Sequence, residues 1–309
     1  QFSSALFSAV TGVALFDLGG DGRPDGLVYS TKAIPGVTLR EATVKFEPLR
    51  LFAFRAGVMR IPFSLQQQSA NTGLMFPSRA RPNEVFLSGA DFGAELRSDV
   101  KDGRLVASFG VYNGDSLGLQ IENQSARGVV LSGRLDANPL GKFTLDAGDH
   151  QRGPFRFGVG AGVLFRPATL YDERTGTEEK SFQDVRLSGS LRLAVRGLYF
   201  AAEYFRRQQL DDYSGRAHVA DGAYAQAAFF FSVTERFAFE PIVRAGYVHE
   251  DQTFDGRLTG YTDAGINFFP VANAERPSDV KITAQYLGER RFTEQEDAHG
   301  SALSLQLRF

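Results

Sequence analysis

The sequence predicts an all-β fold, namely a transmembrane antiparallel up-and-down β-barrel of about 14 strands, with 12 or 16 strands as alternatives. Three observations predict it. Apolar and polar residues alternate with a period of two in segments of about 10 residues. The links between these segments are alternately short and long. The composition, with 28 Phe, 10 Tyr and 33 Gly but only two Met, favours twisted strands over helices.

The alternation can be followed from segment to segment along the chain. In the segment 155–165, Phe157, Val159 and Val163 share one face, while Arg156 and three glycines occupy the other. The segments 184–193, 279–286 and 301–309 repeat the pattern. The expected strands, in order, are 5–16, 37–47, 50–60, 90–98, 103–113, 127–136, 155–166, 183–194, 198–207, 222–232, 236–248, 258–269, 279–289 and 301–309.

The links differ in length at the two ends of these strands. Long polar links follow the odd strands, and they include expected outer loops at 17–36 and 61–89. Links after the even strands are mostly short. The exception is 137–154, part of which is expected to extend one of the two neighbouring strands. Such alternation is typical of a membrane barrel whose short turns and termini face the periplasm. Residues 1–309 then form a single barrel domain, whereas a soluble all-β protein would not need alternating loop lengths.

Bulk composition excludes several classes of protein. The net charge of −2 offers no basic excess for nucleic-acid phosphates, so no nucleic-acid partner is expected. Because the chain has no Cys, disulfides, thiolate metal sites and cysteine nucleophiles are excluded. No run of about 18 apolar residues could form a transmembrane helix. No signal segment is present, so we expect the numbering to start after a removed signal or an upstream segment.

Motifs in the first part of the chain resemble one family. The strings "REATVKFE", "FRAGVMRIPFSLQ", "FPSRARP", "SGADFGAEL" and "SFGVYNGD" occur within residues 37–115 in the order and rough spacing of the phosphate-selective porin O and P family. Later strings, "AAEYFRR", "FEPIVRAGY" and "INFFP", look similar, and the terminal Phe309 resembles the C-terminal signal of outer-membrane barrels. The resemblance implies a bacterial outer-membrane porin, typically trimeric, whose segment after "PFSL" folds into the pore.

The chain also departs from that family. Better-known members look sixteen-stranded, which is more strands than this sequence predicts. The expected constriction, 62–89, has only Arg79 and Arg81 as cations, whereas a dedicated phosphate channel needs a dense basic ladder. The resemblance therefore supports the fold and the pore, and phosphate specificity is not carried over.

The residues opposite the apolar faces are expected to line the lumen. Most of the cations among them are arginines, whose guanidinium groups bind anions in a bidentate way. The alternative is that facing acids pair with them and brace the wall, which leaves a nearly neutral pore. The expected inward cations are Lys45, Arg55, Arg97, Arg134, Arg156, Arg186, Arg192, Arg207, Arg244, Lys281 and Arg308; the acids are Glu41, Asp91, Glu95, Asp136, Glu203, Glu240 and Asp263.

The segment 62–89 is the expected constriction, because a link of this length is usually functional or disordered. Its first half, "PFSLQQQSANTGLMF", is polar, uncharged and long enough to fold inward. Its polar side chains either hydrogen-bond a passing solute or tie the segment to the wall. These side chains are Gln66, Gln67, Gln68, Asn71, Arg79 and Arg81.

The stretch "DLGGDGRPD" in the first outer loop is a weak candidate for calcium. Asp17, Asp21 and Asp25 have a spacing that could hold one Ca²⁺, although Gly19 and Val28 occupy positions where a full calcium loop has ligands. The alternative is an Asp/Gly/Pro turn without a metal. No other cofactor is expected.

We predict a porin-like channel for passive diffusion of small hydrophilic solutes or ions, with a mild anion preference. The expected surroundings are outer-membrane lipid and lipopolysaccharide, with a homotrimer implied by the resemblance. One alternative is a plugged barrel that anchors partner proteins of an envelope complex. Another is a hydrolase at the rim, for which the candidates are His249 with Glu250 and Asp251, and His299 with Asp297 and Glu296. Tyr112, Tyr199, Tyr247 and Tyr286 are expected in interfacial girdles.

Overall fold

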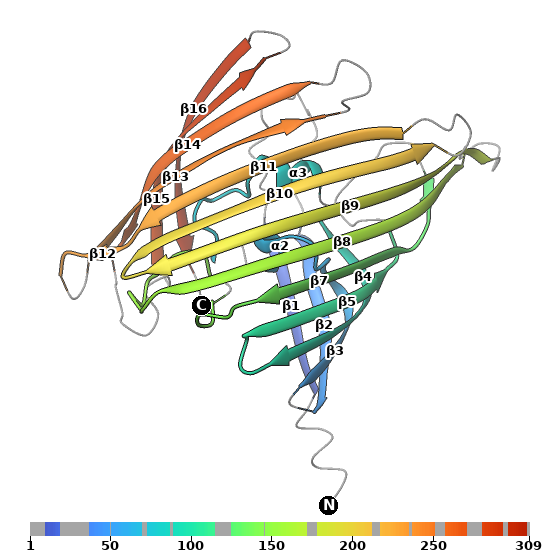
Figure 1. Cartoon of the computed structure of the whole chain (residues 1–309), viewed down its shortest axis with the longest axis horizontal. Coiled ribbons are helices and arrows are strands. Elements are labelled where there is room, and N and C mark those ends of the chain that lie inside the picture. The colour runs from blue at the N-terminus through green and yellow to red at the C-terminus, as the bar shows by residue number, and fades with distance from the viewer. Residues whose placement is uncertain are drawn as a thin grey trace, which may run out of the picture.

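Fourteen long strands form one antiparallel sheet in the computed structural model of the chain, and the sheet rolls into an up-and-down barrel (Figure 1). Each long strand pairs with the long strands next to it in sequence, and the first and last strands stand at the two ends of this order. The structure describes residues 10–18, 37–49, 51–69, 73–86, 89–114, 125–144, 146–171, 178–211, 217–234, 237–250, 257–270, 280–292 and 296–307.

All fourteen strands predicted from the alternation are present. Two further short strands, β6 (Ser125–Arg127) and β12 (Phe231–Ser232), pair at the margins of the sheet with β8 and β13. The long strands are β1 (Val10–Leu18), β2 (Val37–Leu49), β3 (Phe52–Arg60), β4 (Ala90–Val100), β5 (Leu105–Tyr112), β7 (Val130–Ala137), β8 (Arg156–Tyr171), β9 (Glu178–Val195), β10 (Leu198–Asp211), β11 (Ala217–Phe229), β13 (Ala238–His249), β14 (Leu258–Phe269), β15 (Val280–Arg291) and β16 (Glu296–Leu307).

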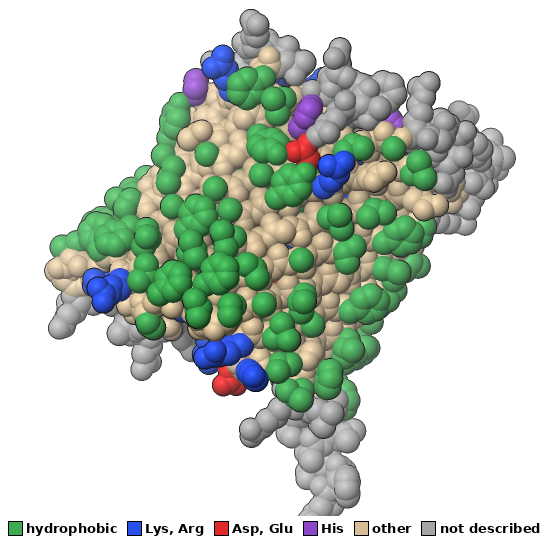
Figure 2. Space-filling view, in the orientation of Figure 1, with side chains coloured by type: hydrophobic (Ala, Val, Ile, Leu, Met, Phe, Trp, Pro, Cys, Tyr) green, Lys and Arg blue, Asp and Glu red, His purple; other side chains and the backbone are tan. Residues whose placement is uncertain are grey.

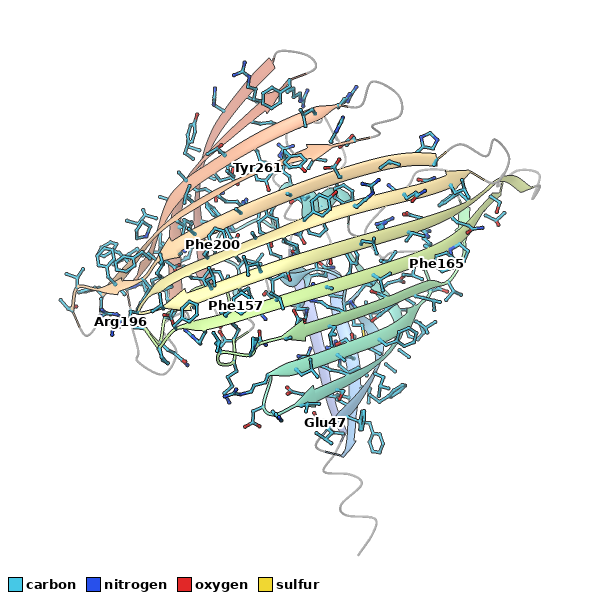
Figure 3. The ribbon with its side chains drawn as sticks, in the orientation of Figure 1. Glu47, Phe157, Phe165, Arg196, Phe200 and Tyr261 are labelled. Carbon is cyan, nitrogen blue, oxygen red and sulfur yellow. The ribbon has the colours of Figure 1, made fainter. Side chains whose placement is uncertain are left out.

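Successive residues of each strand face opposite sides of the wall, because the side-chain period of a strand is two. In β13, Val243 is 47% exposed on the outer face, while its neighbour Arg244 is 2% exposed inside. On the face of the wall that Figure 2 shows, apolar side chains cover the middle, and most of the visible charged side chains lie towards the two ends. Figure 3 labels Phe157 and Phe165 on β8, two of the residues predicted to share its apolar face. This outer band is the surface that a bilayer covers.

The links show the predicted difference between the two ends of the barrel in the first half of the chain. The difference is lost later, because β13–β14 and β15–β16 are joined by 250–257 and 292–295 at one end, while β14–β15 is joined by the longer 270–279 at the other. At the turn end, β2 and β3, β4 and β5, and β9 and β10 are joined by the short links 50–51, 101–104 and 196–197. The interpretation of this region as a strand extension was wrong. β7 and β8 are joined by the long link 138–155, which contains no strand. At the opposite end, which we call the loop end, the segment 61–89 joins β3 to β4.

The described residues of this segment, 61–69, 73–86 and 89, lie inside the barrel and include two short helices, α2 (Leu65–Gln68) and α3 (Arg81–Phe86) (Figure 1). Helix α3 contacts β10, β11 and β13. Apolar side chains of this segment form a buried cluster with inward side chains of the wall; its members are Met59, Ile61, Phe63, Ala80, Phe86, Tyr112, Val130, Leu164, Phe205, Tyr224, Val248 and Tyr261.

The girdle prediction was wrong for two of its four tyrosines. Tyr112 and Tyr199 are buried inside the barrel, because they share a face with the inward residues Ser108 and Ala201 of their own strands. Tyr286 is 48% exposed on the outer face. None of the helices in the described parts of the chain is long and apolar enough to cross a membrane.

Candidate functional site

Residues 61–69, 73–86 and 89, which we call the inner loop, lie in the lumen. The start of this loop is fixed by helix α2, whose cap Ser64 accepts a hydrogen bond from the backbone N of Gln67 at 3.1 Å. Ile61 and Phe63 have almost no accessible surface. An irregular segment at this depth is stable only when its backbone polar groups are satisfied by protein or water.

Donors on β7 and β9 satisfy the carbonyl groups at the start of the inner loop. The carbonyl oxygen of Phe63 accepts from Arg134 at 3.0 Å and from Ser188 at 2.7 Å. Ser132 donates to the carbonyl oxygen of Pro62 at 2.9 Å. These bonds hold the loop against one side of the lumen.

Donors on the later strands hold the rest of the inner loop. Each donor is a polar side chain that faces inward, and each acceptor is a backbone carbonyl oxygen of the loop. The pairs are Arg186 to Phe86 at 2.8 Å, Arg244 to Ser78 at 3.0 Å, Asn267 to Met75 at 3.0 Å and Lys281 to Leu74 at 2.5 Å. The inner loop is therefore attached to the wall from β7 to β15.

Gln66 organises the fold of the inner loop itself. Its Oε1 accepts from the backbone N of Ala80 at 2.8 Å and from Nδ2 of Asn83 at 3.1 Å, and its Nε2 donates to Gln226 on β11 at 3.0 Å. Glu203 on β10 accepts from the backbone N of Leu65 at 2.8 Å. The geometry gives Gln66 a structural role.

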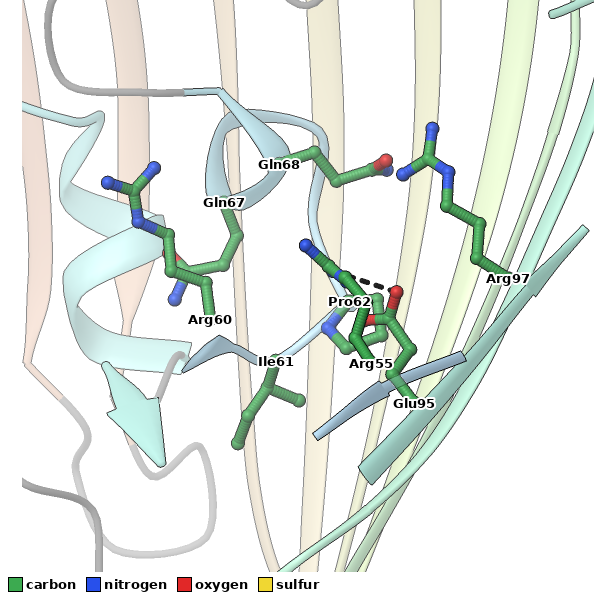
Figure 4. Close-up of a pocket in the computed structure, with 8 residues that line it drawn as sticks. All are labelled: Arg55, Arg60, Ile61, Pro62, Gln67, Gln68, Glu95 and Arg97. Atoms are coloured by element: carbon green, nitrogen blue, oxygen red, sulfur yellow. Dashed lines mark hydrogen bonds and ion pairs between the residues drawn. The ribbon is translucent and has the colours of Figure 1, made fainter. Parts of the chain in front are cut away.

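On the side of β3 and β4, the inner loop leaves a narrow pocket, which we call the eyelet (Figure 4). Its volume is about 90 Å³. Figure 4 shows strand and loop side chains directed toward this space. The lining residues are Arg55, Arg60, Ile61, Pro62, Gln67, Gln68, Glu95 and Arg97.

The eyelet is electropositive, since three guanidinium groups surround one carboxylate. Arg55 forms an ion pair with Glu95 at 2.8 Å, and Tyr112 donates to the other oxygen of Glu95 at 3.3 Å. Arg60 donates to the carbonyl oxygen of Ser69. The side chain of Arg97 forms no hydrogen bond or ion pair with any residue that the structure describes.

A larger cavity of about 650 Å³, which we call the chamber, lies beside the eyelet and extends toward the turn end. Gln68 and Arg97 line both spaces, so they stand at the passage between them. Arg192 also lines the chamber, with its guanidinium carbon 4.6 Å from the ring centroid of Phe143. Arg192 donates to Oδ1 of Asn138 at 3.2 Å and makes no ion pair within the described parts of the chain.

Most of the other inward arginines form ion pairs with acids. Arg134 bonds Asp136, and Arg186 bonds Asp184, in each case across two positions on the same strand face. The N–O distances are 2.7 Å for Arg134–Asp136, 2.6 Å for Arg186–Asp184 and 2.6 Å for Arg244–Asp263; Arg156 pairs with Asp149 as well. The structure thus separates bracing arginines from Arg97 and Arg192.

Neither cation of the inner loop lines the eyelet. Arg79 donates to the carbonyl oxygens of Gln66 and Ser69, at 3.3 and 3.1 Å, and Arg81 pairs with Glu289 on β15. Gln67 lines the eyelet and donates to the carbonyl oxygen of Gly89 at 2.8 Å. Asn71 lies outside the described residues.

The sequence reasoning missed Arg60 and Phe143. Parity assigns Arg60 to the lipid side, but β3 ends at this residue and the chain turns into the lumen, so parity no longer applies. Phe143 belongs to the link 138–155, whose inward course has no periodic signal. Only the unusual length of that link could have indicated that it folds into the barrel.

The calcium prediction falls largely outside the described residues. Asp21 and Asp25 lie outside them, and Asp17 belongs to the end of β1, paired with Thr38, instead of starting the loop. Within the described ranges, no group of three or more acidic or histidine side chains is arranged to hold a metal ion.

The two histidines considered for catalysis do not come together. His249 at the end of β13 has its Nδ1 3.9 Å from Asp221 on β11. His299 on β16 bonds the hydroxyl of Tyr286 at 2.6 Å. Strands β14 and β15 separate the two histidines. Asp251 and the side chains of Glu296 and Asp297 lie outside what the structure describes.

Comparisons with known proteins agree with this geometry. The sequence pattern of the family described as phosphate-selective porin O and P matches residues 16–309. No curated protein matches the chain. Among solved structures, the outer-membrane expressed OmpT of Vibrio cholerae is similar with a TM-score of 0.52 at 10% identity, over 87% of this chain and 78% of that chain.

Two further structures of the same Vibrio cholerae protein are similar. A loop-deletion mutant of OmpT has a TM-score of 0.55 at 11% identity, over 95% of this chain and 89% of that chain. The in-vitro folded trimer form has a TM-score of 0.53 at 10% identity, over 96% of this chain and 87% of that chain. At such identities the likeness shows the outer-membrane barrel fold alone.

Proposed function

The chain belongs to the phosphate-selective porin O and P family, and from that premise we propose that it is a channel for passive diffusion of small hydrophilic solutes and ions, with a mild preference for anions. Its location is the bacterial outer membrane, as the family and the barrel fold indicate. The proposed route passes through the eyelet and the chamber, between the inner loop and the wall of β3, β4 and β5.

The observation that carries the anion preference is the unpaired guanidinium of Arg97. This group stands where the eyelet meets the chamber, and no carboxylate of the described chain forms an ion pair with it. Arg192 supports the same conclusion further along the route. The paired arginines contribute little net charge to a passing ion, because each has an acid beside it. We do not propose phosphate specificity, since two unpaired arginines are far fewer than a basic ladder.

The first prediction concerns Arg97→Gln. Two unit charges 4 Å apart in water interact by about 1 kcal/mol, which corresponds to a factor of about five. We therefore expect the ratio of anion to cation permeability to fall by up to about fivefold in Arg97→Gln. The ratio is obtained from the reversal potential across planar bilayers bathed by a KCl gradient.

Arg206→Gln is the matched control. Arg206 is exposed on the outer face of β10, so this substitution removes the same charge outside the lumen. Its permeability ratio should equal that of the unaltered protein. An unchanged ratio in Arg97→Gln, with normal conductance, would refute the role of Arg97.

A plugged barrel that anchors an envelope complex is the second candidate. The attachment of the inner loop to the wall from β7 to β15 favours it, because so many bonds make a spontaneous withdrawal of the loop costly. The absence of any ion conductance from the folded protein in bilayers would support this candidate over the channel.

We propose no catalytic activity, since the porin family and the separated histidines both support a channel. The proposed surroundings are outer-membrane lipid and lipopolysaccharide. A homotrimer is compatible with the trimer form of the similar Vibrio cholerae structure and stays a prediction for this chain. The calcium site at Asp17, Asp21 and Asp25 likewise stays a prediction.

A further inference from the structure

The turn end of the barrel carries a second irregular segment, residues 138–144 and 146–154, which we call the turn flap. It begins at Asn138, whose Nδ2 donates to the carbonyl oxygen of Gly103 in the β4–β5 turn at 2.7 Å. Near its end, Asp149 accepts from the backbone N of Gly197 in the β9–β10 turn at 2.8 Å. The flap is thus attached to the turns on both sides of it.

The turn flap also reaches into the lumen. The Nε2 atom of His150 lies 3.2 Å from Oε1 of Glu240, an inward carboxylate of β13 that is 1% exposed. The ring of His150 packs against Phe230 and Phe269, at centroid distances of 5.0 and 5.3 Å. A segment lying outside the mouth could not reach these buried groups.

The turn flap and the inner loop touch inside the barrel. The backbone N of Ala147 donates to the carbonyl oxygen of Gly73 at 2.7 Å. A second connection runs through the wall: Nδ2 of Asn267 donates to the carbonyl oxygen of Met75 at 3.0 Å and to Glu240 at 2.8 Å, and Glu240 in turn pairs with His150 of the flap. The two irregular segments therefore form one bonded structure across the lumen.

Five residues of the turn flap line the chamber, and Phe143 is the aromatic one among them; the others are Asn138, Lys142, Thr144 and Asp146. The ring of Phe143 supports the guanidinium of Arg192, and it lies against Gly158 on β8, where a Cβ would come within 3.2 Å of the ring carbon Cε2. The glycine at position 158 thus leaves space for this ring. Phe143, Arg192 and the exposed Lys142 line the chamber on its turn-end side.

We propose that the turn flap is a second constriction in series with the eyelet, and that Phe143 and Arg192 set its width and its charge. A solute that has passed the eyelet then leaves the chamber beside a flat apolar ring and a guanidinium without an acid partner. This arrangement admits small anions and excludes bulkier solutes at a second point. The inference rests on the proposed channel function.

A single introduced cysteine tests the position of the turn flap, because the chain has no Cys of its own. Lys142→Cys alters an exposed residue, so folding should be unaffected. We expect a negatively charged methanethiosulfonate reagent, added to the turn-end side of a planar bilayer, to reduce the single-channel conductance at least twofold. Val233→Cys, in the turn before β13 and 60% exposed, is the control and should not respond.

The outcomes separate the two proposals. Conductance of the unaltered protein with no response of modified Lys142→Cys would overturn the second constriction and leave the channel standing. A folded protein that does not conduct at all would overturn the channel itself. Complete labelling is verified by the mass of the modified chain.

Phe143→Ala provides an independent measurement of width. We expect its conductance to rise about 1.5-fold or more, and larger poly(ethylene glycol) molecules to enter the pore, since the ring and its support of Arg192 are both lost. Phe229→Ala removes an equivalent ring that is 45% exposed on the outer wall, and should leave both quantities unchanged. Equal polymer cut-offs for Phe143→Ala and the unaltered protein would refute the role of the ring.

Discussion

At the scale of single residues, Gly162 shows how the wall makes room for the inner loop. It lies on the inward face of β8, and a Cβ at this position would overlap the carbonyl oxygen of Phe63. That oxygen accepts the bonds from Arg134 and Ser188. A side chain at position 162 would therefore push the loop away from the donors that hold it.

We predict that Gly162→Val loosens the inner loop and raises the conductance. Overpacking of this kind costs about 1–3 kcal/mol, so the free energy of unfolding should fall by that amount. Gly189→Val is the control, because nothing lies within 4 Å of a Cβ at position 189. Bilayer conductance and urea unfolding from lipid vesicles measure the two effects. Equal conductance and equal free energies of unfolding in Gly162→Val and Gly189→Val would contradict a tight fit at Gly162.

Residue type alone does not reveal which arginines contribute to the pore. Arg97 and Arg134 are both inward arginines on strands, yet Arg134 is buried beside Asp136 and Arg97 has no acid partner among the described residues. The pairing of Arg134 could be read from its spacing of two from Asp136 on one strand face. The absence of a partner for Arg97 depends on neighbouring strands and on the inner loop.

At the scale of elements, the strands are stable in a bilayer because their two faces meet different solvents. Strand β13 places Val243 outside, and Arg244 inside, where it bonds Asp263 and the carbonyl oxygen of Ser78. Its backbone pairs with β14 from Ala238 to His249 and with β11 from Ile242 to His249, so most of its polar groups are satisfied by neighbouring strands, as a lipid environment requires.

We predict that Val243→Arg destabilises the barrel by about 2–4 kcal/mol, the cost of arginine on a lipid face near the bilayer midplane. Val233→Arg, at the turn end, should cost no more than about 1 kcal/mol. Urea unfolding in lipid vesicles provides both free energies. Similar losses in the two variants would argue against a bilayer around β13.

The inner loop is the element that most reduces the lumen. Backbone carbonyl groups buried without hydrogen-bond partners would destabilise this irregular loop. Inward Asn, Lys, Ser and Arg side chains of the wall donate hydrogen bonds to them. These polar wall residues therefore serve mainly to hold the loop, and the side facing β3 and β4 remains for passage.

At the scale of the whole molecule, the chain has a net charge of −2. The proposed route through it is nevertheless lined by two arginines without ion-pair partners in the described chain, Arg97 and Arg192. The anion preference is thus a local property of the route, and it depends on electrostatics that salt screens. The Debye length falls from about 10 Å at 0.1 M to about 3 Å at 1 M.

We predict that the ratio of anion to cation permeability declines toward one when the mean KCl concentration is raised from 0.1 to 1 M, because screening shortens the reach of Arg97 and Arg192. Reversal potentials at a constant concentration ratio measure this change. A ratio independent of salt would indicate selection by size alone.

Much of the fold could be predicted from the sequence. All fourteen strands follow from the alternation, and the lengths of the links identified the end from which the inner loop enters. Less of the site could be predicted. Gln66, Arg79 and Arg81 were expected either to bond a passing solute or to tie the loop to the wall, and the sequence could not decide between the two. Gln66 and Arg79 bond within the loop, and Gln66 and Arg81 also bond the wall. Arg60 and Phe143 were missed, because parity ends where a strand ends.

The strands, the membrane-facing surface and the family of this protein all follow from its amino-acid sequence. Those properties depend on the two-residue period and on local motifs, which are short-range features of a chain. Only the tertiary structure decided which arginines are paired, where the eyelet lies and that the turn flap folds inward. These features depend on contacts between residues far apart in sequence, such as Lys281 with Leu74 and His150 with Glu240, which no local pattern encodes.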